Sequence, residues 1–388
     1  MDNLLVNKVR GEFAQWLGVA PAILAYAPGR IEVLGNHTDY NEGYVLSAAI
    51  DCGIAMAVTP IEGPECRLAA LDIHGEARFS ATDPDHAQTP VWANYVRGVY
   101  ANMLARGGRP RAFAAAFRGT LPMGAGLSSS AAIEISAGLA LARLLDMLVT
   151  PIEMAKIGQA AEHDYVGVKC GLLDQISSLF GREGMLVHSD FRTLEVRHEP
   201  LGGGAVFLIA NTAVKHRLVE SAYNERREKC EEAARFFASV LPHPVRALRD
   251  VTWDEWRAWA PRMDPCTARR AAHVVGENTR VVAGSAMLER GDLAGFGRLM
   301  FDSHESSRTQ FENSCPELDT LVATARTLPG VHGARLSGGG FGGSVVVLVR
   351  AAAADDAAVS LRAAYAQTYG HPCDTRRMRP SSGASLFG

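Results

Sequence analysis

The segment from Leu121 to Ala132 reads LPMGAGLSSSAA and joins a strand-like run to a long helical pattern. Gly124 and Gly126 allow a tight turn and a close ligand, because neither residue carries a Cβ atom. The helix predicted over Leu127–Leu145 begins within the serines, so its first amide N–H groups have no intrahelical partner. Such a helix start binds phosphate, since the free N–H groups and the helix dipole both favour an anion. A serine-rich N-cap after a glycine turn is the purely structural alternative.

This segment fits neither of two common glycine-rich nucleotide motifs. A P-loop requires a lysine after its second glycine, and the stretch has none. The dinucleotide fingerprint G-x-G-x-x-G fails at its third glycine. The hydroxyls of Ser128, Ser129 and Ser130 add donors, and a hydroxyl can also coordinate Mg²⁺ beside a phosphate.

Upstream, the stretch from Ala27 to Asn41 reads APGRIEVLGNHTDYN and is dense in side chains that bind polyols. Asn36, His37 and Asp39 bring an amide, an imidazole and a carboxylate within four residues, and such a loop can hold several sugar hydroxyls. Asn, Asp and Gly are also ordinary turn residues, which is the structural alternative. A zinc site is disfavoured, because one His and one Asp do not complete it.

Downstream, two carboxylates follow the helical pattern that Pro151 opens. Glu162 lies near the end of that helix, and Asp174 follows among apolar neighbours. A carboxylate in apolar surroundings is costly unless it is paired or used, although an exposed Asp near a helix N-terminus is equally ordinary. Further on, Ser337–Ser344 reads SGGGFGGS between two strand-like runs, which indicates a close backbone approach to a ligand or loop rather than a flexible linker.

The order of predicted elements indicates an α+β fold rather than a regular βαβ alternation. A boundary is expected near residues 195–205, because the run from Pro200 to Gly204 interrupts both patterns. We therefore expect an N-terminal domain over 1–200, carrying the sugar and phosphate loops, and a C-terminal domain over 201–388. Predicted helices cover Val91–Arg106, Leu127–Leu145, Pro151–Tyr165, Glu220–Val240, Pro265–Arg290, Asp292–Asp302, Pro316–Thr327 and Ala351–Tyr369. Predicted strands cover Tyr44–Ile50, Gly53–Thr59, Cys66–Leu71, Ala77–Ala81, Arg111–Arg118, Ala205–Ala210, Gly333–Leu336 and Ser344–Arg350.

The composition limits the classes of protein that fit. The chain has 388 residues, 47% hydrophobic and 21% charged, with a net charge of −3. This balance excludes long disorder and a general nucleic-acid binder. No apolar run reaches the ~20 residues of a membrane span, and the N-terminus lacks the pattern of a secretory signal, so a cytoplasmic protein is expected. The seven cysteines are odd in number and never spaced C-x-x-C, which favours reduced thiols over disulfides or structural zinc.

Together, Gly29–Asn41, Gly124–Ala132 and Gly338–Gly343 resemble, in order, the three motifs of the GHMP kinases, and the galactokinases among them in particular. The segment Trp92–Gly98 is similar to one that lies near the adenine in that family. Further similar stretches are Val214–Arg227, Arg270–Val281, Ser314–Asp319 and Pro380–Ala384, so the resemblance spans roughly residues 20–384.

The resemblance implies a two-domain GHMP kinase fold with the active site in the cleft between the domains. It implies ATP-dependent phosphorylation of a hexose, galactose or a galactose-like sugar, at its C1 hydroxyl. The products are the sugar 1-phosphate and ADP, and Mg²⁺ accompanies ATP. The implied partners are the sugar and ATP, without nucleic acid or membrane, for a monomer or at most a weak homodimer.

Carried onto this sequence, the resemblance implies that Asp174 is the catalytic base and that Arg30 stabilises charge on the transferred phosphoryl group. It implies that Ser130 and Glu162 hold Mg²⁺. The implied sugar-binding residues are Asn36, His37, Asp39, Gly171 and Tyr223, and the implied ATP-binding residues are Trp92, Gly124, Gly126, Ser128, Ser129 and Ser130.

The chain departs from the family pattern at two places. Glu32 stands where the family has Asn, and Asn36 stands where it has Glu; Thr309, Gln310 and Phe311 replace two acidic residues and a tyrosine. An amide binds a hydroxyl more weakly than a carboxylate does. Asn36 therefore predicts weaker discrimination for galactose, or a preference for another hexose or a uronic acid, unless Glu32 offsets the exchange.

Two alternatives to a sugar kinase remain open. A galactokinase-like sensor without catalysis would lack part of the serine loop, whereas Ser128–Ala132 is complete here. A kinase of the same fold for mevalonate or homoserine is disfavoured by the galactokinase-like stretches in the second half of the chain.

Overall fold

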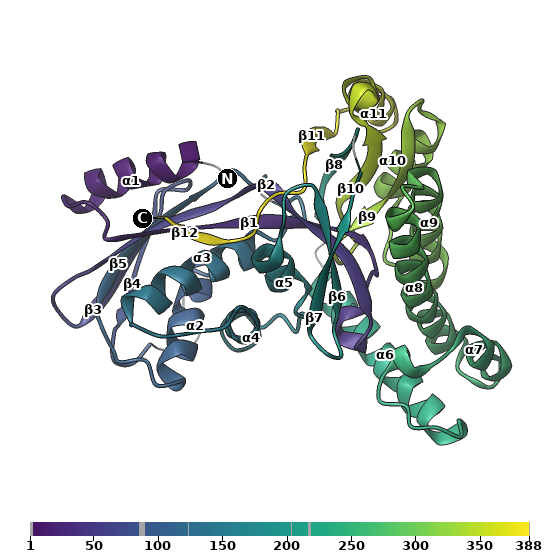
Figure 1. The fold of residues 1–388 in the computed structure, drawn as a ribbon, viewed down its shortest axis with the longest axis horizontal. Helices are drawn as coiled ribbons and strands as arrows, with labels where there is room; N and C mark the ends of the chain where they lie inside the picture. The colour runs from purple at the N-terminus through teal and green to yellow at the C-terminus, as the bar shows by residue number, and fades with distance from the viewer. Residues whose placement is uncertain (1–2, 85–89, 123, 203, 216–218, 388) are drawn as a thin grey trace.

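The computed structural model describes residues 3–84, 90–122, 124–202, 204–215 and 219–387. Two lobes meet at a waist, and two long strands, β1 (Ile23–Leu34) and β2 (Tyr44–Pro60), run from the first lobe towards the second (Figure 1). Within the described residues the first lobe holds an eight-stranded sheet in the order β12-β1-β2-β5-β3-β4, and β6 and β7 extend it from β2. The remaining strands are β3 (Glu65–Ala70), β4 (Gly75–Ser80), β5 (Phe113–Gly119), β6 (Met185–Asp190), β7 (Glu195–Pro200) and β12 (Ser385–Phe387).

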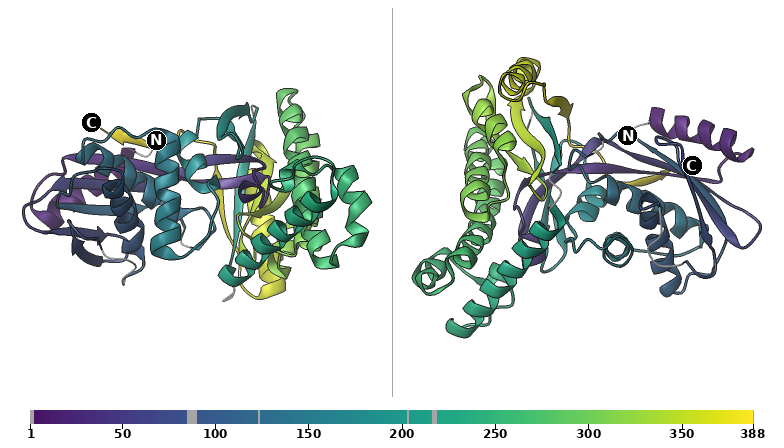
Figure 2. Two further views of the ribbon diagram at one scale, coloured as in Figure 1. Left: turned by 90° about the horizontal axis from the view of Figure 1, so that it is seen from below. Right: turned by 180° about the vertical axis from the view of Figure 1, so that it is seen from behind.

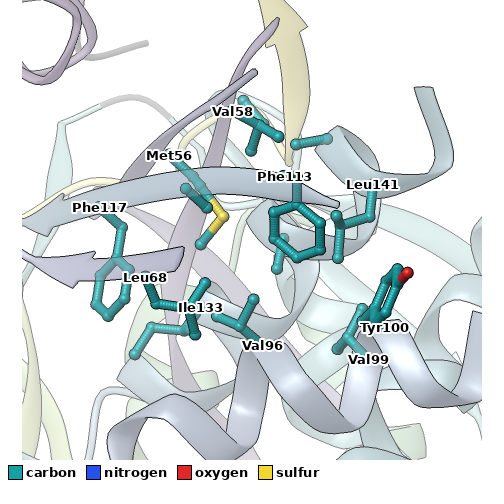
Figure 3. Close-up of a cluster of buried hydrophobic side chains, with 14 of the residues drawn as sticks. Met56, Val58, Leu68, Val96, Val99, Tyr100, Phe113, Phe117, Ile133 and Leu141 are labelled. Atoms are coloured by element: carbon teal, nitrogen blue, oxygen red, sulfur yellow. The ribbon is translucent and has the colours of Figure 1, made fainter. Parts of the chain in front are cut away.

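Successive side chains of a strand point to opposite faces of a sheet. Helices cover both faces of this sheet. Leu24 and Tyr26 of β1 pack against α1 (Asn3–Leu17). Ala25 and Ala27, one residue out of phase, belong to the core formed with α2 (Trp92–Ala105), α3 (Ser129–Leu144) and α4 (Pro151–Ala161). Figure 3 shows this core, in which the sheet residues Met56, Val58, Leu68, Phe113 and Phe117 meet the helix residues Val96, Val99, Tyr100, Ile133 and Leu141.

Strand β2 is a single strand of 17 residues, where the sequence predicted two runs that meet at Asp51. Its C-terminal half pairs with β5 in the first lobe, and its N-terminal residues from Tyr44 to Ser47 pair with β6. The exposed Asp51 interrupts the hydrophobic pattern without ending the strand, because β1 pairs with β2 on both sides of it. One long strand therefore carries the sheet through the waist.

The second lobe is built on an antiparallel sheet of four described strands in the order β11-β8-β10-β9. Side chains on one face of this sheet, including Val206, Leu208 and Val347, pack with α10 and α11. Helices α8, α9 and α10 stand at the end of the molecule opposite α1 (Figure 2). The strands are β8 (Ala205–Lys215), β9 (Val331–Ser337), β10 (Gly342–Arg350) and β11 (Asp374–Met378), and the helices are α6 (Val219–Val240), α7 (Trp253–Trp259), α8 (Pro265–Glu289), α9 (Leu293–Ser306), α10 (Pro316–Thr327) and α11 (Ala354–Tyr369).

A shared hydrophobic core joins the lobes. Ile31 of β1 and Leu46 of β2 lie in one buried cluster with Phe207 of β8 and Phe296 of α9. All four side chains are fully buried. The waist is therefore a packed core, and the loops that approach it from both lobes are held against each other.

Most predicted elements are confirmed, with ends that shift by a few residues. The helix predicted to reach Tyr165 ends at Ala161 and continues as a π-helical turn over Glu162–Val166. The first sheet ends with β7 and the second begins with β8, at the place where the sequence predicted a change of pattern. However, β12 pairs with β1, so residues near the end of the chain return to the first sheet.

Candidate active site

The centre of the site is an ion pair between Arg30 and Asp174. The guanidinium Nε of Arg30 donates to a carboxylate oxygen of Asp174 at 2.7 Å, and its Nη1 donates to the carbonyl oxygen of Gly126 at 2.7 Å. The hydroxyl of Ser128 donates a short hydrogen bond to the other oxygen of Asp174. Asp174 lies in the first turn of α5 (Leu173–Phe180). The structure thus brings Arg30 and Asp174 together, and the serine loop contacts both residues.

Two cavities adjoin this pair. The first has a volume of about 210 Å³ and the second about 260 Å³. Arg30, Asp174, Gly338 and Gly339 line both. The first cavity is also lined by Glu32, Asn36, His37, Asp39, Glu162, Val168, Cys170, Gly171, Leu173 and Tyr223, and the second by residues of the serine loop between Leu121 and Ser130.

The first cavity brings together all five residues predicted to bind the sugar. Burial, and then the charge of Glu32, raise the pKa of Asp39 to about 7. A Cβ atom at Gly171 would overlap the carboxylate of Asp39, so only glycine fits at this position. Burial lowers the pKa of His37 to about 3, and its imidazole therefore stays neutral at physiological pH.

Aromatic rings surround His37. Its ring lies 5.2 Å from that of Tyr223 and 4.5 Å from that of Phe311, and its Nδ1 is 2.8 Å from the hydroxyl of Tyr40. Phe311 stands where the family has a tyrosine. It is fully buried and packs against His37 from inside the protein. The imidazole is thereby held in one orientation at the cavity wall.

The second cavity follows the backbone of the serine loop. Gly124 and Gly126 have φ values of 72° and 69°, the left-handed region that favours glycine, and Ser128 also has a positive φ of 57°. Helix α3 begins at Ser129, and Ser128 does not cap it, because its hydroxyl bonds to Asp174 instead. The amide N–H groups of the first turn are thus left for a ligand. Met123 in the same loop lies outside the described residues.

A carboxylate and a hydroxyl suited to a divalent cation lie next to this loop. Ser130 hydrogen-bonds to Glu162, which lies in the π-helical turn, and the thiol of Cys170 donates to the Glu162 carboxylate at 2.7 Å. Burial raises the pKa of Glu162, and the charge of Asp174 adds to the rise, so a nearby cation would favour its ionised form. Mg²⁺ accepts one or two protein oxygens and completes its shell with phosphates and water, so these residues fit it. No group of three or more His, Cys, Asp or Glu side chains suited to a metal occurs among the described residues.

Helix α8 holds the loop of Gly35 and Asn36 from the second half of the chain. One carboxylate oxygen of Glu277, which is fully buried, accepts hydrogen bonds from the backbone N–H groups of Gly35 and Asn36, both at 2.8 Å. Although burial raises the pKa of Glu277, the positive charges around it, with Arg280 first among them, together outweigh burial and hold the pKa well below its usual range. Glu277 belongs to no motif of the sequence, and its one signal is its place in the family-like stretch from Arg270 to Val281.

The described residues leave untested one expectation about ATP, which concerns Trp92, and part of one family-like stretch, Val214–Arg227. Trp92 is half-buried at the start of α2, with its ring 5.7 Å from that of Phe117, and it does not line the second cavity. Its assignment to the nucleotide site stays a prediction. The stretch Val214–Arg227 is described only in part, because residues 216–218 lie outside the described residues.

Comparisons with known proteins agree with this geometry. The model of the GHMP kinase N-terminal domain matches residues 94–182, the galactokinase galactose-binding signature matches residues 11–60, and the GHMP kinase C-terminal model matches residues 286–367. Within the described residues, no helix has the length and apolar character needed to cross a membrane.

Relatives extend the similarity over nearly the whole chain. A galactokinase of Roseiflexus sp. is 37% identical over 97% of this chain and 96% of its own length. The crystal structure of Lactococcus lactis galactokinase complexed with galactose superposes with a TM-score of 0.93 at 31% identity, over 98% of this chain and 99% of that one. The Methanococcus jannaschii mevalonate kinase, at 16% identity and a TM-score of 0.62 over 92% of this chain and 98% of its own, shares the fold alone. With such relatives along almost its full length, the chain belongs to the galactokinase family of GHMP kinases.

Proposed function

We propose that this protein transfers the γ-phosphoryl group of ATP to the C1 hydroxyl of galactose, giving galactose 1-phosphate and ADP. The observation that carries the proposal is the pair of cavities that share Arg30 and Asp174 as a common wall. One cavity suits a polyhydroxylated ligand and the other suits phosphate. A sugar in the first and a nucleotide in the second would meet at this wall.

Asp174 is the proposed general base. One of its carboxylate oxygens takes the proton of the C1 hydroxyl while the sugar oxygen forms its bond to the γ-phosphorus. The bond between the γ-phosphorus and the β–γ bridging oxygen breaks, and the electron pair leaves with ADP. Arg30, which contacts Asp174 at 2.7 Å, stabilises the charge on the transferred phosphoryl group.

The serine loop holds the nucleotide phosphates in this proposal. The N–H groups at the start of α3 bind phosphate oxygens, and the positive φ values at Gly124 and Gly126 keep the loop in the required turn. Ser130 and Glu162 hold Mg²⁺, which when bound neutralises part of the phosphate charge. The loop from Gly338 to Gly343 closes the site from the second lobe.

The other partners follow from the same chemistry. Asn36, His37, Asp39, Gly171 and Tyr223 are the proposed sugar-binding residues, and Trp92 is the proposed neighbour of the nucleotide base. We place the reaction in the cytoplasm, where ATP is available, and propose that a monomer is active, because one chain contains both cavities.

An assay of ADP release with a panel of sugars tests the proposal. The panel contains galactose, glucose, mannose, fructose, N-acetylgalactosamine and galacturonate, each with ATP and Mg²⁺, and ³¹P NMR identifies the product. We expect the highest kcat/KM with galactose and a phosphate at C1. ADP release that no sugar stimulates would contradict the kinase proposal, and a phosphate on another carbon would contradict the assigned position.

A further inference from the structure

The side chain of Asn36 has no hydrogen-bonding capacity left for a sugar. Its amide nitrogen donates to Glu32 at 3.0 Å and to the carbonyl oxygen of Gly338 at 2.9 Å. Its amide oxygen accepts from Asn313 at 3.0 Å and from Ser307 at 3.4 Å. A primary amide offers two donor hydrogens and two acceptor lone pairs, so all four are engaged. Asn36 therefore lines the sugar cavity but serves as part of its frame.

Glu32 differs from Asn36 in this respect. Its carboxylate lines the same cavity and is only 2% exposed. It accepts one amide hydrogen from Asn36, which lies 3.0 Å from one carboxylate oxygen and 3.3 Å from the other, a backbone N–H from Gly338 at 3.2 Å and, more distantly, a hydrogen from Arg335 at 3.5 Å. Two carboxylate oxygens offer about four acceptor positions. Three donated hydrogens therefore leave one acceptor position for a hydroxyl, on a group that lines the sugar cavity.

The charge of Glu32 is balanced from within the protein. Arg335 is fully buried beside it, and two of its guanidinium nitrogens, Nε and Nη2, have no hydrogen-bond partner among the described residues. A buried guanidinium with spare donors favours a negative charge close by. Arg30 adds a second positive charge near Glu32, although burial is the larger influence and leaves the pKa of Glu32 above its ordinary value.

We infer that Glu32 is the specificity-determining carboxylate of the sugar cavity, that it accepts a hydrogen bond from a sugar hydroxyl, and that Asn36 is the positioning residue that orients it. This inference rests on the proposed function and names the substrate class more narrowly. The preferred substrate is a neutral hexose with a hydroxyl at this wall. A uronic acid is disfavoured, because its carboxylate would enter a buried cavity that already holds the carboxyl groups of Glu32 and Asp39.

Replacing Glu32 by its neutral isostere provides the first test. Steady-state kinetics of Glu32→Gln should show a KM for galactose raised at least ~10-fold and a kcat within ~3-fold of wild type, since the changed group does not touch the reacting atoms. The ratio of kcat/KM for galacturonate to that for galactose should rise. A folded Glu32→Gln protein with the wild-type KM and ratio would overturn the inference. The matched control is Glu199→Gln, which neutralises a buried carboxylate outside both cavities and should keep the wild-type KM.

An exchange of the two residues keeps the inference testable if Glu32→Gln does not fold. Asn36→Glu alone sets two carboxylates against each other in a buried site and should bind galactose more weakly than wild type. The exchange variant, Glu32→Asn with Asn36→Glu, restores one carboxylate and one amide at the same wall and should recover affinity at least ~10-fold over Asn36→Glu. An exchange variant no better than Asn36→Glu would overturn the inference.

The wild-type protein separates this inference from the proposed function. Wild type that does not phosphorylate galactose overturns the function itself. Wild type that does so, with a galactose KM insensitive to Glu32→Gln, overturns only the role of Glu32.

Discussion

Asp174 accepts hydrogen bonds at both carboxylate oxygens, from the Nε of Arg30 and from the hydroxyl of Ser128. Both contacts fix the orientation of the carboxylate. The proposed proton acceptor is thus in place before the sugar binds, and the arginine proposed to stabilise the phosphoryl group lies beside it.

Substitution of this base is the first prediction. Asp174→Asn keeps the size and removes the charge, so kcat should fall at least ~10²-fold, while the affinities for galactose and ATP change less. Single-turnover kinetics and calorimetry would measure the two effects separately. Asp164→Asn, which alters an exposed carboxylate outside both cavities, is the control. Wild-type turnover in Asp174→Asn would exclude Asp174 as the base.

The raised pKa of Asp39 predicts that the stability of the folded protein depends on pH. Its pKa is about 7 in the folded protein and ~3.9 in an unfolded chain, so between these values the folded state holds a proton that the unfolded state has released. Stability therefore falls as the pH rises through this window. An amide in place of the acid cannot ionise, and we expect Asp39→Asn to melt at least ~2 °C above wild type at pH 8, with the gap closing towards pH 4. Thermal unfolding from pH 4 to 9 measures it, and a gap that does not change with pH would refute the assignment.

At the scale of elements, the turn before α3 has backbone in the left-handed region and lines the second cavity. Gly126→Val should weaken ATP binding at least ~10-fold, because a branched side chain would stand at a φ of 69° beside the phosphate cavity. Gly370→Val is the matched control, since Gly370 has a φ of 81° and no atom within 4 Å of an added Cβ. The control should lose stability without losing ATP affinity. Calorimetry that finds unchanged ATP binding in folded Gly126→Val would show that the loop is not a phosphate site.

Ser130 at the start of α3 and Glu162 in the π-helical turn are the proposed Mg²⁺ ligands, so changes at either residue should alter the Mg²⁺ requirement. Ser130→Ala and Glu162→Gln each remove one oxygen ligand or its charge, so the Mg²⁺ concentration for half-maximal activity should rise at least ~5-fold at fixed ATP. The control is Ser136→Ala on the same helix, which removes a hydroxyl that donates to the carbonyl oxygen of Ile133. It should leave the Mg²⁺ dependence unchanged. An unaltered Mg²⁺ titration in both ligand variants would remove Ser130 and Glu162 from the site.

Element prediction succeeded where the pattern was local. Pro316–Thr327 was predicted with its observed ends, because Pro at the first helical position and the apolar spacing both lie within the segment. Strand β1 was missed, because Pro28 and Gly29 indicate a turn. The strand nevertheless continues through them with a register shift, and a Cβ at Gly29 would lie 2.5 Å from the carbonyl oxygen of Leu127 in the serine loop. Such an irregularity is specified by a tertiary contact that no local pattern contains.

Both lobes contribute side chains to the core at the waist, so the packing of this core should affect the stability of the whole molecule. Phe207→Ala should lower the free energy of unfolding by about 3–5 kcal/mol, the range for removing a buried aromatic ring. Because this core joins both lobes, a single cooperative transition should shift in denaturant titrations followed by fluorescence and circular dichroism. Val359→Ala, at a position 57% exposed on α11, should change stability by less than ~0.5 kcal/mol. A Phe207→Ala protein of wild-type stability would contradict the role of this core.

At this scale, motifs pointed to residues that line the cavities and left their supports unseen. Arg30 and Asp39 lie in a dense polar stretch, Asp174 is a carboxylate among apolar neighbours, and the first cavity includes all three. Glu277 and Asn313 lie in ordinary helical and loop sequence more than 240 residues from their partners Gly35 and Asn36. Contacts over such separations follow from the packing of α8 and the second lobe on the first. They could not be read from spacing.

The pairing of β12 with β1 sets an order of events during synthesis. Leu24 emerges from the ribosome early, whereas its partner Phe387 is made more than 350 residues later. The nascent chain therefore carries an incomplete edge on its first sheet, with unsatisfied backbone groups beside Tyr26, until β12 has been made. Strand β1, which carries Arg30, becomes fully paired only after β12 has left the exit tunnel, so the first sheet is completed late although most helices of the chain can form earlier.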